Sequence, residues 1–195
     1  MTTALVPVKK GKFIPQRRGM EHYYPPLPDY IITDEAQRII EAAKDKPRDY
    51  LFFELLWNSG LRVSEALSLT PSHFRDNALR VKGKGGKWRV IPLKGVFFTQ
   101  MVIYCHDKFK AYDLIFPFTR SQAHRLLSKY AKRAGIERKL HCHLFRHGFA
   151  VNFLKQVPNL VYLQELLGHS SIETTRIYTR AALPDVREAI EKMVM

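Results

Sequence analysis

The early part of the chain alternates hydrophobic and polar residues at helical spacing. In residues 34–44 apolar positions recur every three or four residues behind Thr33, which predicts an amphipathic helix capped by Thr33. Its first turn carries acidic residues, which the helix dipole favours there. Residues 48–60 are apolar on most sides, so we expect a buried helix that ends at Gly60. A short helix is predicted over 63–69.

The middle of the chain changes to strand-like runs. Strands are predicted over 78–82 and 88–93, joined as an antiparallel hairpin by the turn KGKGGK. Helical patterns then return over 94–109, 119–135, 143–156, 159–168, 171–179 and 184–193, with an extended piece over 113–118. There is no internal repeat. The pattern predicts an α+β fold that is mainly α, with a small antiparallel sheet.

The amino-terminal residues 1–30 differ from the rest of the chain. The stretch YYPPLP disfavours helix and favours an extended path. Five basic residues precede it: Lys9, Lys10, Lys12, Arg17 and Arg18. Two interpretations stay open, a tail without a role and a basic arm laid along DNA. We therefore divide the chain into an arm over 1–30, a globular domain over 31–182 and a C-terminal helix over 183–195.

Charge narrows the class of partner. The chain has 195 residues and a formal net charge of +14. A domain this basic usually binds a polyanion. Nucleic acid is favoured over a membrane surface because no basic amphipathic helix concentrates the charge. No apolar run is long enough to cross a membrane, and Cys105 and Cys142 lack CxxC spacing. We expect a cytoplasmic protein without a disulfide framework.

Four stretches of the chain carry polar residues that core packing does not require, and two of them lie in the first half. In NSGLRVSEALSL, Arg62 follows a helix stop and Glu65 lies three residues later. A guanidinium at such a corner is able to hold a phosphate through two hydrogen bonds, although a surface Arg–Glu pair is the favoured interpretation of this stretch taken alone. The KGKGGK turn joins two strands and has no Ser or Thr after its lysine, which argues against a Walker A nucleotide site.

The other two stretches lie in the second half. In HCHLFRHGFA, His143 and Arg146 share a helix face. His141, His143 and His147 raise the question of a metal, but Leu144 stands where an HExxH site needs Glu, so we expect no metal site. In LLGHSSIETTRIYT, His169 follows Gly168 and Tyr178 comes nine residues later. Taken alone, a tyrosine at such a position is more commonly a half-buried core residue.

Taken together and in this order, these stretches resemble the tyrosine recombinase/integrase family. The strings SGLRVSEALSL, VKGKGGKWRVIPL, HLFRHGFA and LLGHSSIETTRIYT carry the resemblance, over about residues 30–182. Within that family it resembles phage integrase-like and Xer-like catalytic domains. The resemblance implies an enzyme that cleaves one DNA strand by tyrosine attack on a phosphodiester, leaving a 3′-phosphotyrosyl link and a free 5′-hydroxyl. It implies double-stranded DNA as the partner and no cofactor, metal or ATP.

The resemblance also implies roles for six residues. These are Arg62, Lys84, His143, Arg146, His169 and Tyr178. Tyr178 is the expected nucleophile, and the two arginines clamp the phosphate and stabilise the charge of the transition state. His143 assists as a base toward Tyr178 or as a phosphate donor, and His169 donates to the phosphate. Lys84 is the expected general acid, with Lys87 as its rival.

Glu65 is expected to orient the residues that contact the phosphate. Further DNA contacts are expected from Lys82, Lys87 and Arg89 of the hairpin and from the five basic residues of the arm. The glycine-rich turn then has a function, because a flexible tip carries its lysine into a DNA groove.

Strand exchange in this family needs several protomers on two duplexes, usually four. The 183–195 helix carries an apolar stripe that either docks on a neighbouring protomer or folds back on its own domain. Most family members have a further amino-terminal helical domain, whereas about thirty residues precede the catalytic domain here. Two other functions remain open: an idle DNA-binding protein of the same fold and a type IB topoisomerase-like relaxing enzyme.

Overall fold

The structure is a computed structural model that describes residues 5–6, 14–15, 28–83 and 86–182. The helices are α1 (Thr33–Ala42), α2 (Pro47–Ser59), α3 (Val63–Ala66), α4 (Gly95–His106), α5 (Arg120–Arg133), α6 (His143–Gln156), α7 (Leu160–Leu167), α8 (Glu173–Arg176) and α9 (Thr179–Ala182), with a 3₁₀ turn η1 (Pro71–His73). None of the helices in these ranges is both long and apolar enough to span a bilayer.

A three-stranded antiparallel sheet follows η1. Its order is β3 (Phe74–Arg75), β4 (Ala78–Lys82) and β5 (Trp88–Pro92), with Lys82 opposite Trp88 and Leu79 opposite Ile91. Asp76 and Asn77 turn β3 into β4 with φ of 54° each, a left-handed conformation that Asp and Asn tolerate better than most residues. In the amino-terminal arm, β1 (Leu5–Val6) pairs antiparallel with β2 (Ile14–Pro15).

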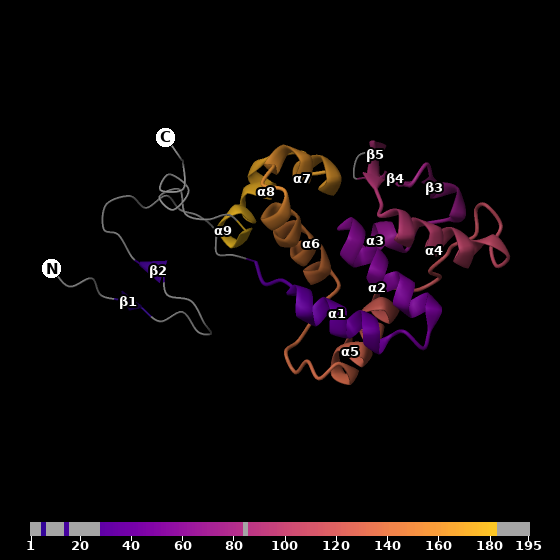
Figure 1. Cartoon of the computed structure of the whole chain (residues 1–195), viewed down its shortest axis with the longest axis horizontal. Helices are drawn as coiled ribbons and strands as arrows, with labels where there is room; N and C mark the ends of the chain where they lie inside the picture. The colour runs from indigo at the N-terminus through magenta and orange to yellow at the C-terminus, as the bar shows by residue number, and fades with distance from the viewer. Residues whose placement is uncertain (1–4, 7–13, 16–27, 84–85, 183–195) are drawn as a thin grey trace.

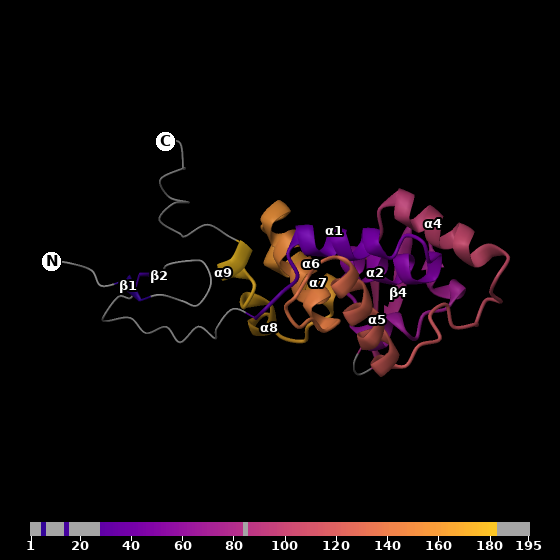
Figure 2. The same cartoon turned by 90° about the horizontal axis from the view of Figure 1, so that it is seen from below.

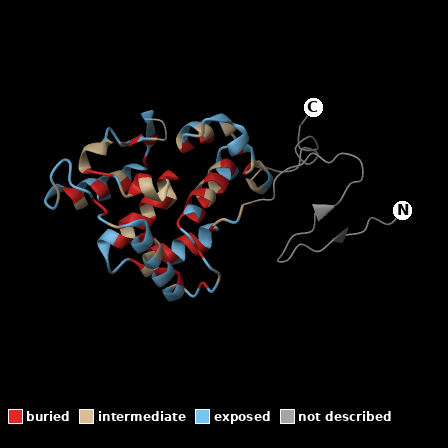
Figure 3. Cartoon of the chain, turned by 180° about the vertical axis from the view of Figure 1, so that it is seen from behind, coloured by how far each residue is buried: buried red, intermediate tan, exposed pale blue. Residues whose placement is uncertain are grey.

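The apolar residues form two adjoining clusters. The larger one gathers the buried faces of α1, α2 and α5, the inner face of the sheet and the first part of α6. The smaller one joins the second part of α6 to α7 and to Tyr178. Figure 3 shows buried residues along the inner sides of these helices, with exposed residues on their outer sides. α6 therefore belongs to both clusters.

α6 links the two ends of the molecule. It packs against α2 and α1 on one side and against α7 and α9 on the other. In Figures 1 and 2 the helices α9 and α4 lie at opposite ends of the described domain. Because the candidate residues follow the ends of α2 and α7 or lie on α6, this arrangement brings segments distant in sequence together.

The predicted class, mainly α with a small antiparallel sheet, is confirmed. The predicted cap of the first helix, Thr33, was wrong. Thr33 is the first residue of α1 and Ile32 is its N-cap, whose N–H donates a hydrogen bond to Glu35 Oε2 at 3.2 Å. β3 was not predicted, because two residues are too short for a recognisable pattern. The helix predicted over 184–193 lies outside the described residues.

Candidate active site

Arg62 lies three residues after the last residue of α2, at the start of α3. Gly60 ends α2 in the left-handed conformation, with φ of 60°, and so redirects the chain into α3. Arg62 NH1 donates to Glu65 Oε1 at 3.0 Å, and the Arg62 backbone N–H donates to Glu65 Oε2 at 2.9 Å. The Arg62 side chain is 33% exposed, so the guanidinium is anchored at one edge and open to solvent elsewhere.

Glu65 is shared with a second arginine. Arg89 NH1 and NH2 donate to the two Glu65 oxygens at 3.0 and 2.9 Å, and Arg89 Nε donates to the Leu166 carbonyl at 2.9 Å. Burial raises the pKa of Glu65, but the hydrogen bonds from Arg89 and the Arg62 N–H outweigh it, so the pKa lies below its ordinary value. Glu65 is therefore an anion held between two cations.

This geometry changes the interpretation of Arg89. The sequence suggested a DNA contact, but the Arg89 side chain is only 10% exposed and commits three donors to Glu65 and Leu166. The bond to Leu166 ties the hairpin to α7, 77 residues away in the chain. The structure favours a positioning role for Arg89 over the DNA contact.

Arg146 is buried between two helix ends. Its residue exposure is 1%, and its NH1 and NH2 groups donate to the Gly60 carbonyl at 2.8 Å and the Leu167 carbonyl at 2.7 Å. Carbonyls at helix C-termini carry partial negative charge, which stabilises a cation there. Burial, followed by the nearby Arg62, lowers the Arg146 pKa to about 10, so the group stays charged at neutral pH.

His169 follows the end of α7 as Arg62 follows the end of α2. Gly168 ends the helix with φ of 64°, and His169 Nδ1 lies 2.9 Å from Thr175 Oγ1. Burial, followed by the nearby Arg146, Arg62 and Arg89, lowers the His169 pKa to about 4. At neutral pH this is an uncharged imidazole whose orientation is set by Thr175.

Tyr178 lies between α8 and α9 and is only 2% exposed. Its hydroxyl lies 2.8 Å from His147 Nδ1. Burial raises the Tyr178 pKa, while Arg146 and Arg62 lower it less. The phenol is thus neutral and in contact with an imidazole.

His143 takes a different position from the one expected for a base. It is exposed at the first turn of α6, and its ring packs edge-on against His147, with centroids 4.5 Å apart. Among the described residues no hydrogen bond joins His143 to Tyr178. Burial lowers the His143 pKa, followed by Arg146, His141 and Arg62.

The hairpin tip is described only in part. Lys84 lies outside the described residues, as do Lys9, Lys10, Lys12, Arg17 and Arg18. Lys82 and Lys87, on either side of the tip, are exposed. The choice between Lys84 and Lys87 as general acid therefore stays a prediction.

Four sequence stretches thus contribute to one site. Arg146 bonds the Gly60 and Leu167 carbonyls, next to Arg62 and His169, and Tyr178 contacts His147, the residue after Arg146. Arg62 and Arg89 share the Glu65 carboxylate, whereas Arg146 is held by backbone carbonyls alone, so the site carries excess positive charge. Such a site suits a bound anion such as a phosphodiester.

Sequence reasoning missed the role of His147. It was considered only as a metal ligand, and in the part of the chain that the structure describes no group of three or more His, Cys, Asp or Glu side chains is placed to hold a metal ion. The signal that could have found it is the helix spacing, since His147 lies four residues after His143 on the same face of α6.

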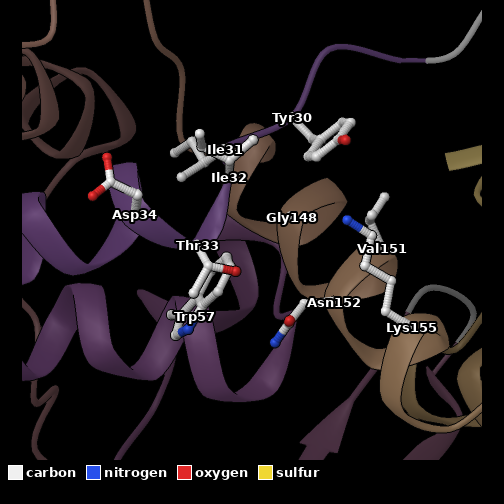
Figure 4. A pocket seen from close by; sticks show the side chains of 10 residues that line it. All are labelled: Tyr30, Ile31, Ile32, Thr33, Asp34, Trp57, Gly148, Val151, Asn152 and Lys155. Carbon is white, nitrogen blue, oxygen red and sulfur yellow. The ribbon is translucent and has the colours of Figure 1, made fainter. Parts of the chain in front are cut away.

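A separate cavity of about 280 Å³ opens on another face of α6. Figure 4 shows its lining: Tyr30, Ile31, Ile32, Thr33, Asp34, Trp57, Gly148, Val151, Asn152 and Lys155. None of the six candidate residues lines it. Gly148 permits the close approach here, because a Cβ at this position would collide with the Ile31 carbonyl oxygen.

Comparison with known proteins identifies relatives of this chain. The model of the phage integrase family matches residues 29–183. Tyrosine recombinase XerA of Pyrococcus furiosus is 36% identical over 179 residues, covering 85% of this chain and 62% of the relative. Tyrosine recombinase XerD of Shewanella oneidensis is 38% identical over 181 residues, covering 83% of this chain and 60% of the relative. The chain thus spans about three fifths of the length of these relatives.

Solved structures agree in fold. The crystal structure of XerA recombinase matches with a TM-score of 0.72 and 29% identity, covering 87% of this chain and 67% of that one. XerH site-specific recombinase, in a post-cleavage complex with a palindromic difH substrate, matches with a TM-score of 0.72 and 26% identity, covering 85% of this chain and 53% of that one. The catalytic domain of bacteriophage HP1 integrase matches with a TM-score of 0.67 and 25% identity, covering 84% and 94% of the two chains.

Proposed function

This chain belongs to the phage integrase family, and from that premise we propose that it is a site-specific tyrosine recombinase acting on double-stranded DNA. The enzyme cleaves one strand through Tyr178 and rejoins it, with a 3′-phosphotyrosyl intermediate. The observation that carries the proposal is that separate parts of the chain meet at α6. Arg146 bonds the Gly60 and Leu167 carbonyls, next to Arg62 and His169, and Tyr178 contacts His147, the residue after Arg146.

The arginines suit the demands of phosphodiester cleavage. The transition state gathers charge on the non-bridging oxygens, and fixed cations stabilise it without reorganising during the reaction. Arg146 is fixed by two helix carbonyls and Arg62 by Glu65. With its Nδ1 engaged by Thr175, His169 has Nε2 left to donate to the phosphate. His143, exposed at the start of α6, is placed in our proposal as a further phosphate donor.

The departing 5′-oxygen needs a proton, and we assign that role to Lys84 at the hairpin tip. The flanking strands are tied to the site through Arg89 and Glu65, which supports the hairpin as the carrier of this lysine. Replacing the lysines one at a time tests the choice. Lys84→Ala should lose cleavage and Lys87→Ala should keep most of it, and the reverse pattern would show that the two roles are exchanged.

The phosphotyrosyl bond conserves the energy of the broken phosphodiester, so a 5′-hydroxyl of another duplex is able to attack it and exchange strands. Exchange requires several protomers, and we propose a tetramer on two duplexes in which residues 183–195 dock on a neighbour. Truncation after Leu183 should abolish assembly in sedimentation experiments but spare DNA binding, and intact assembly would refute the docking. Because DNA is the proposed substrate, we place the protein in the cytoplasm, at the nucleoid.

Covalent trapping tests the proposed function. The full chain is incubated with sheared genomic DNA of the organism that encodes it, SDS is added, and DNA that stays on protein is recovered and sequenced. Wild type and Tyr162→Phe, a control at an exposed tyrosine of α7, should retain DNA at a common site, whereas Tyr178→Phe should not. Tight binding without adducts would indicate an idle DNA-binding protein. Adducts at scattered sites with relaxation of supercoils would indicate topoisomerase-like action.

A further inference from the structure

His147 is the side chain that contacts the proposed nucleophile. Its Nδ1 lies 2.8 Å from the Tyr178 hydroxyl, and the two rings lie 5.6 Å apart between centroids. His147 lies outside the six residues expected from the sequence. An inference about its role rests on the proposed function, because it concerns the attacking oxygen of Tyr178.

The direction of this hydrogen bond depends on the tautomer of His147. Burial, followed by the nearby His143, His141, Arg146 and His169, lowers the His147 pKa to about 4. Burial raises the Tyr178 pKa. Both groups are therefore uncharged at neutral pH, and the phenol O–H donates to Nδ1 when the neutral imidazole carries its hydrogen on Nε2, the tautomer on which the inference rests.

The geometry separates the two histidines of α6. His143 is exposed, and its ring packs edge-on against His147, with ring centroids 4.5 Å apart. His147 is half-buried, and its Nδ1 contacts the phenol. The two roles that the sequence left open for His143, base and phosphate donor, thus fall on two different residues.

We infer that His147 accepts the phenolic proton when Tyr178 attacks the scissile phosphate. In this step the Tyr178 oxygen bonds to phosphorus, its proton moves to His147 Nδ1, the bond from phosphorus to the 5′-oxygen breaks, and Lys84 protonates that oxygen. In rejoining, the 5′-hydroxyl attacks phosphorus, its proton returns to Lys84, and the His147 imidazolium returns its proton to the departing Tyr178.

Binding of DNA strengthens His147 as a base. In the free protein burial opposes protonation of His147, and the positive charge of Arg146 adds to that opposition. A phosphodiester seated on Arg62 and Arg146 offsets that positive field, and an adjacent negative charge favours the imidazolium. The base thus gains proton affinity only when the substrate is in place, which leaves Tyr178 protonated and unreactive in the absence of DNA.

The hydrogen bond is tested first on the full chain without DNA. Nitrogen-15 NMR of the imidazole of His147 reports which ring nitrogen carries the hydrogen. We expect the Nε2–H tautomer, with Nδ1 bare, and a shift toward a mixture of tautomers in Tyr178→Phe. A hydrogen on Nδ1 in the wild type would overturn the inference, because the phenol could not then donate to that atom.

Proton transfer is tested by His147→Asn. The Asn amide oxygen retains an acceptor near the position of Nδ1 but does not titrate, so it separates holding the phenol from taking its proton. With sheared genomic DNA as the probe, we expect adducts to form about 100-fold more slowly in His147→Asn, the scale of general acid–base catalysis, with unchanged DNA affinity. A rate within about threefold of wild type would reduce His147 to a positioning residue and overturn proton transfer.

A modified substrate separates this defect from loss of the general acid. The trapped site is resynthesised with sulfur in place of the bridging 5′-oxygen, a leaving group that departs without being protonated. Cleavage by Lys84→Ala should be restored on this duplex, whereas the defect of His147→Asn should persist. Equal rescue of both variants would overturn the assignment of His147 to Tyr178. Absence of adducts with wild type would instead reject the proposed function, while the tautomer of His147 would still decide the hydrogen bond.

Discussion

At the scale of single residues, Glu65 holds the cationic site together. It accepts hydrogen bonds from Arg62, three residues before it, and from Arg89, 24 residues after it. Its side chain is 8% exposed, so its charge is compensated by these two guanidinium groups rather than by water. Removing the charge would leave two arginines repelling each other and Arg146.

Glu65→Gln is therefore expected to lower the free energy of unfolding by about 3 kcal/mol at pH 7, the usual scale for breaking a buried ion pair. The control is Glu41→Gln, whose exposed pair with Lys44 should contribute less than about 1 kcal/mol. Urea denaturation measures both variants. Equal effects of the two substitutions would contradict a site built on Glu65.

Acid should destabilise the fold through two histidines. The folded pKa values of His147 and His169 are about 4, below their ordinary 6.5. Between these values the unfolded chain binds protons that the folded chain does not, so stability falls as pH drops from 6.5 toward 4. The loss is at most about 3 kcal/mol for each group.

Urea denaturation at a series of pH values measures how the free energy of unfolding depends on pH. Its slope should be shallower in His169→Asn than in wild type or in His106→Asn, a control at the exposed end of α4. An unchanged slope in His169→Asn would contradict this.

Sequence reasoning reached those residues whose position depends on local rules. Gly60 and Gly168 end helices in a conformation that favours glycine, so Arg62 and His169 were recognisable as residues at corners. The hydrogen-bond partners of Arg89 and Tyr178 were not predicted from the sequence. Arg89 bonds Leu166 across 77 positions and Tyr178 bonds His147 across 31, and such contacts depend on how the helices pack.

At the scale of elements, α6 determines the site because it belongs to both hydrophobic clusters. Its residues Arg146 and His147 contact the ends of α2 and α7 and the nucleophile, while Gly148 lets the backbone of Ile31 approach. The helix itself was predicted from spacing. Its tight contact with the segment before α1 was not, because only the three-dimensional packing requires a glycine at position 148.

Gly148→Ala should destabilise the protein by about 2 kcal/mol or more, since the added methyl group collides with the Ile31 carbonyl and lies 2.9 Å from the Trp57 ring. Gly95→Ala is the matched control, because a Cβ there meets nothing within 4 Å and alanine favours the helix. Thermal unfolding compares the two. A stable Gly148→Ala would mean that α6 does not approach Ile31 as closely as described.

At the scale of the whole molecule, the net charge of +14 fits a partner as highly charged as DNA. The charge is spread over the chain, and the described part of the hairpin exposes Lys82 and Lys87 beside the site. The basic arm was divided from the domain on composition alone. Its contact with DNA stays a prediction, since its five basic residues lie outside the described residues.

Replacing those five arm residues by Gln should weaken DNA binding and reduce its dependence on salt. Each lost phosphate contact lowers the slope of log affinity against log salt by about 0.9, so five contacts would lower it by about 4.5. Titration of labelled duplex at several salt concentrations measures the slope. Replacing the same number of exposed lysines and arginines on α5 serves as the control, and an identical slope in both variants would contradict a DNA-binding arm.

The central claim is that Tyr178 forms the covalent bond to DNA. The most direct measurement is mass spectrometry of the DNA-linked peptide after trapped adducts of the wild type are digested with nuclease and protease, with kinase labelling of the released strand. The account predicts a nucleotide attached through its 3′-phosphate to Tyr178 and a free 5′-hydroxyl on the other strand end. Attachment at another residue, or through a 5′-phosphate, would contradict it.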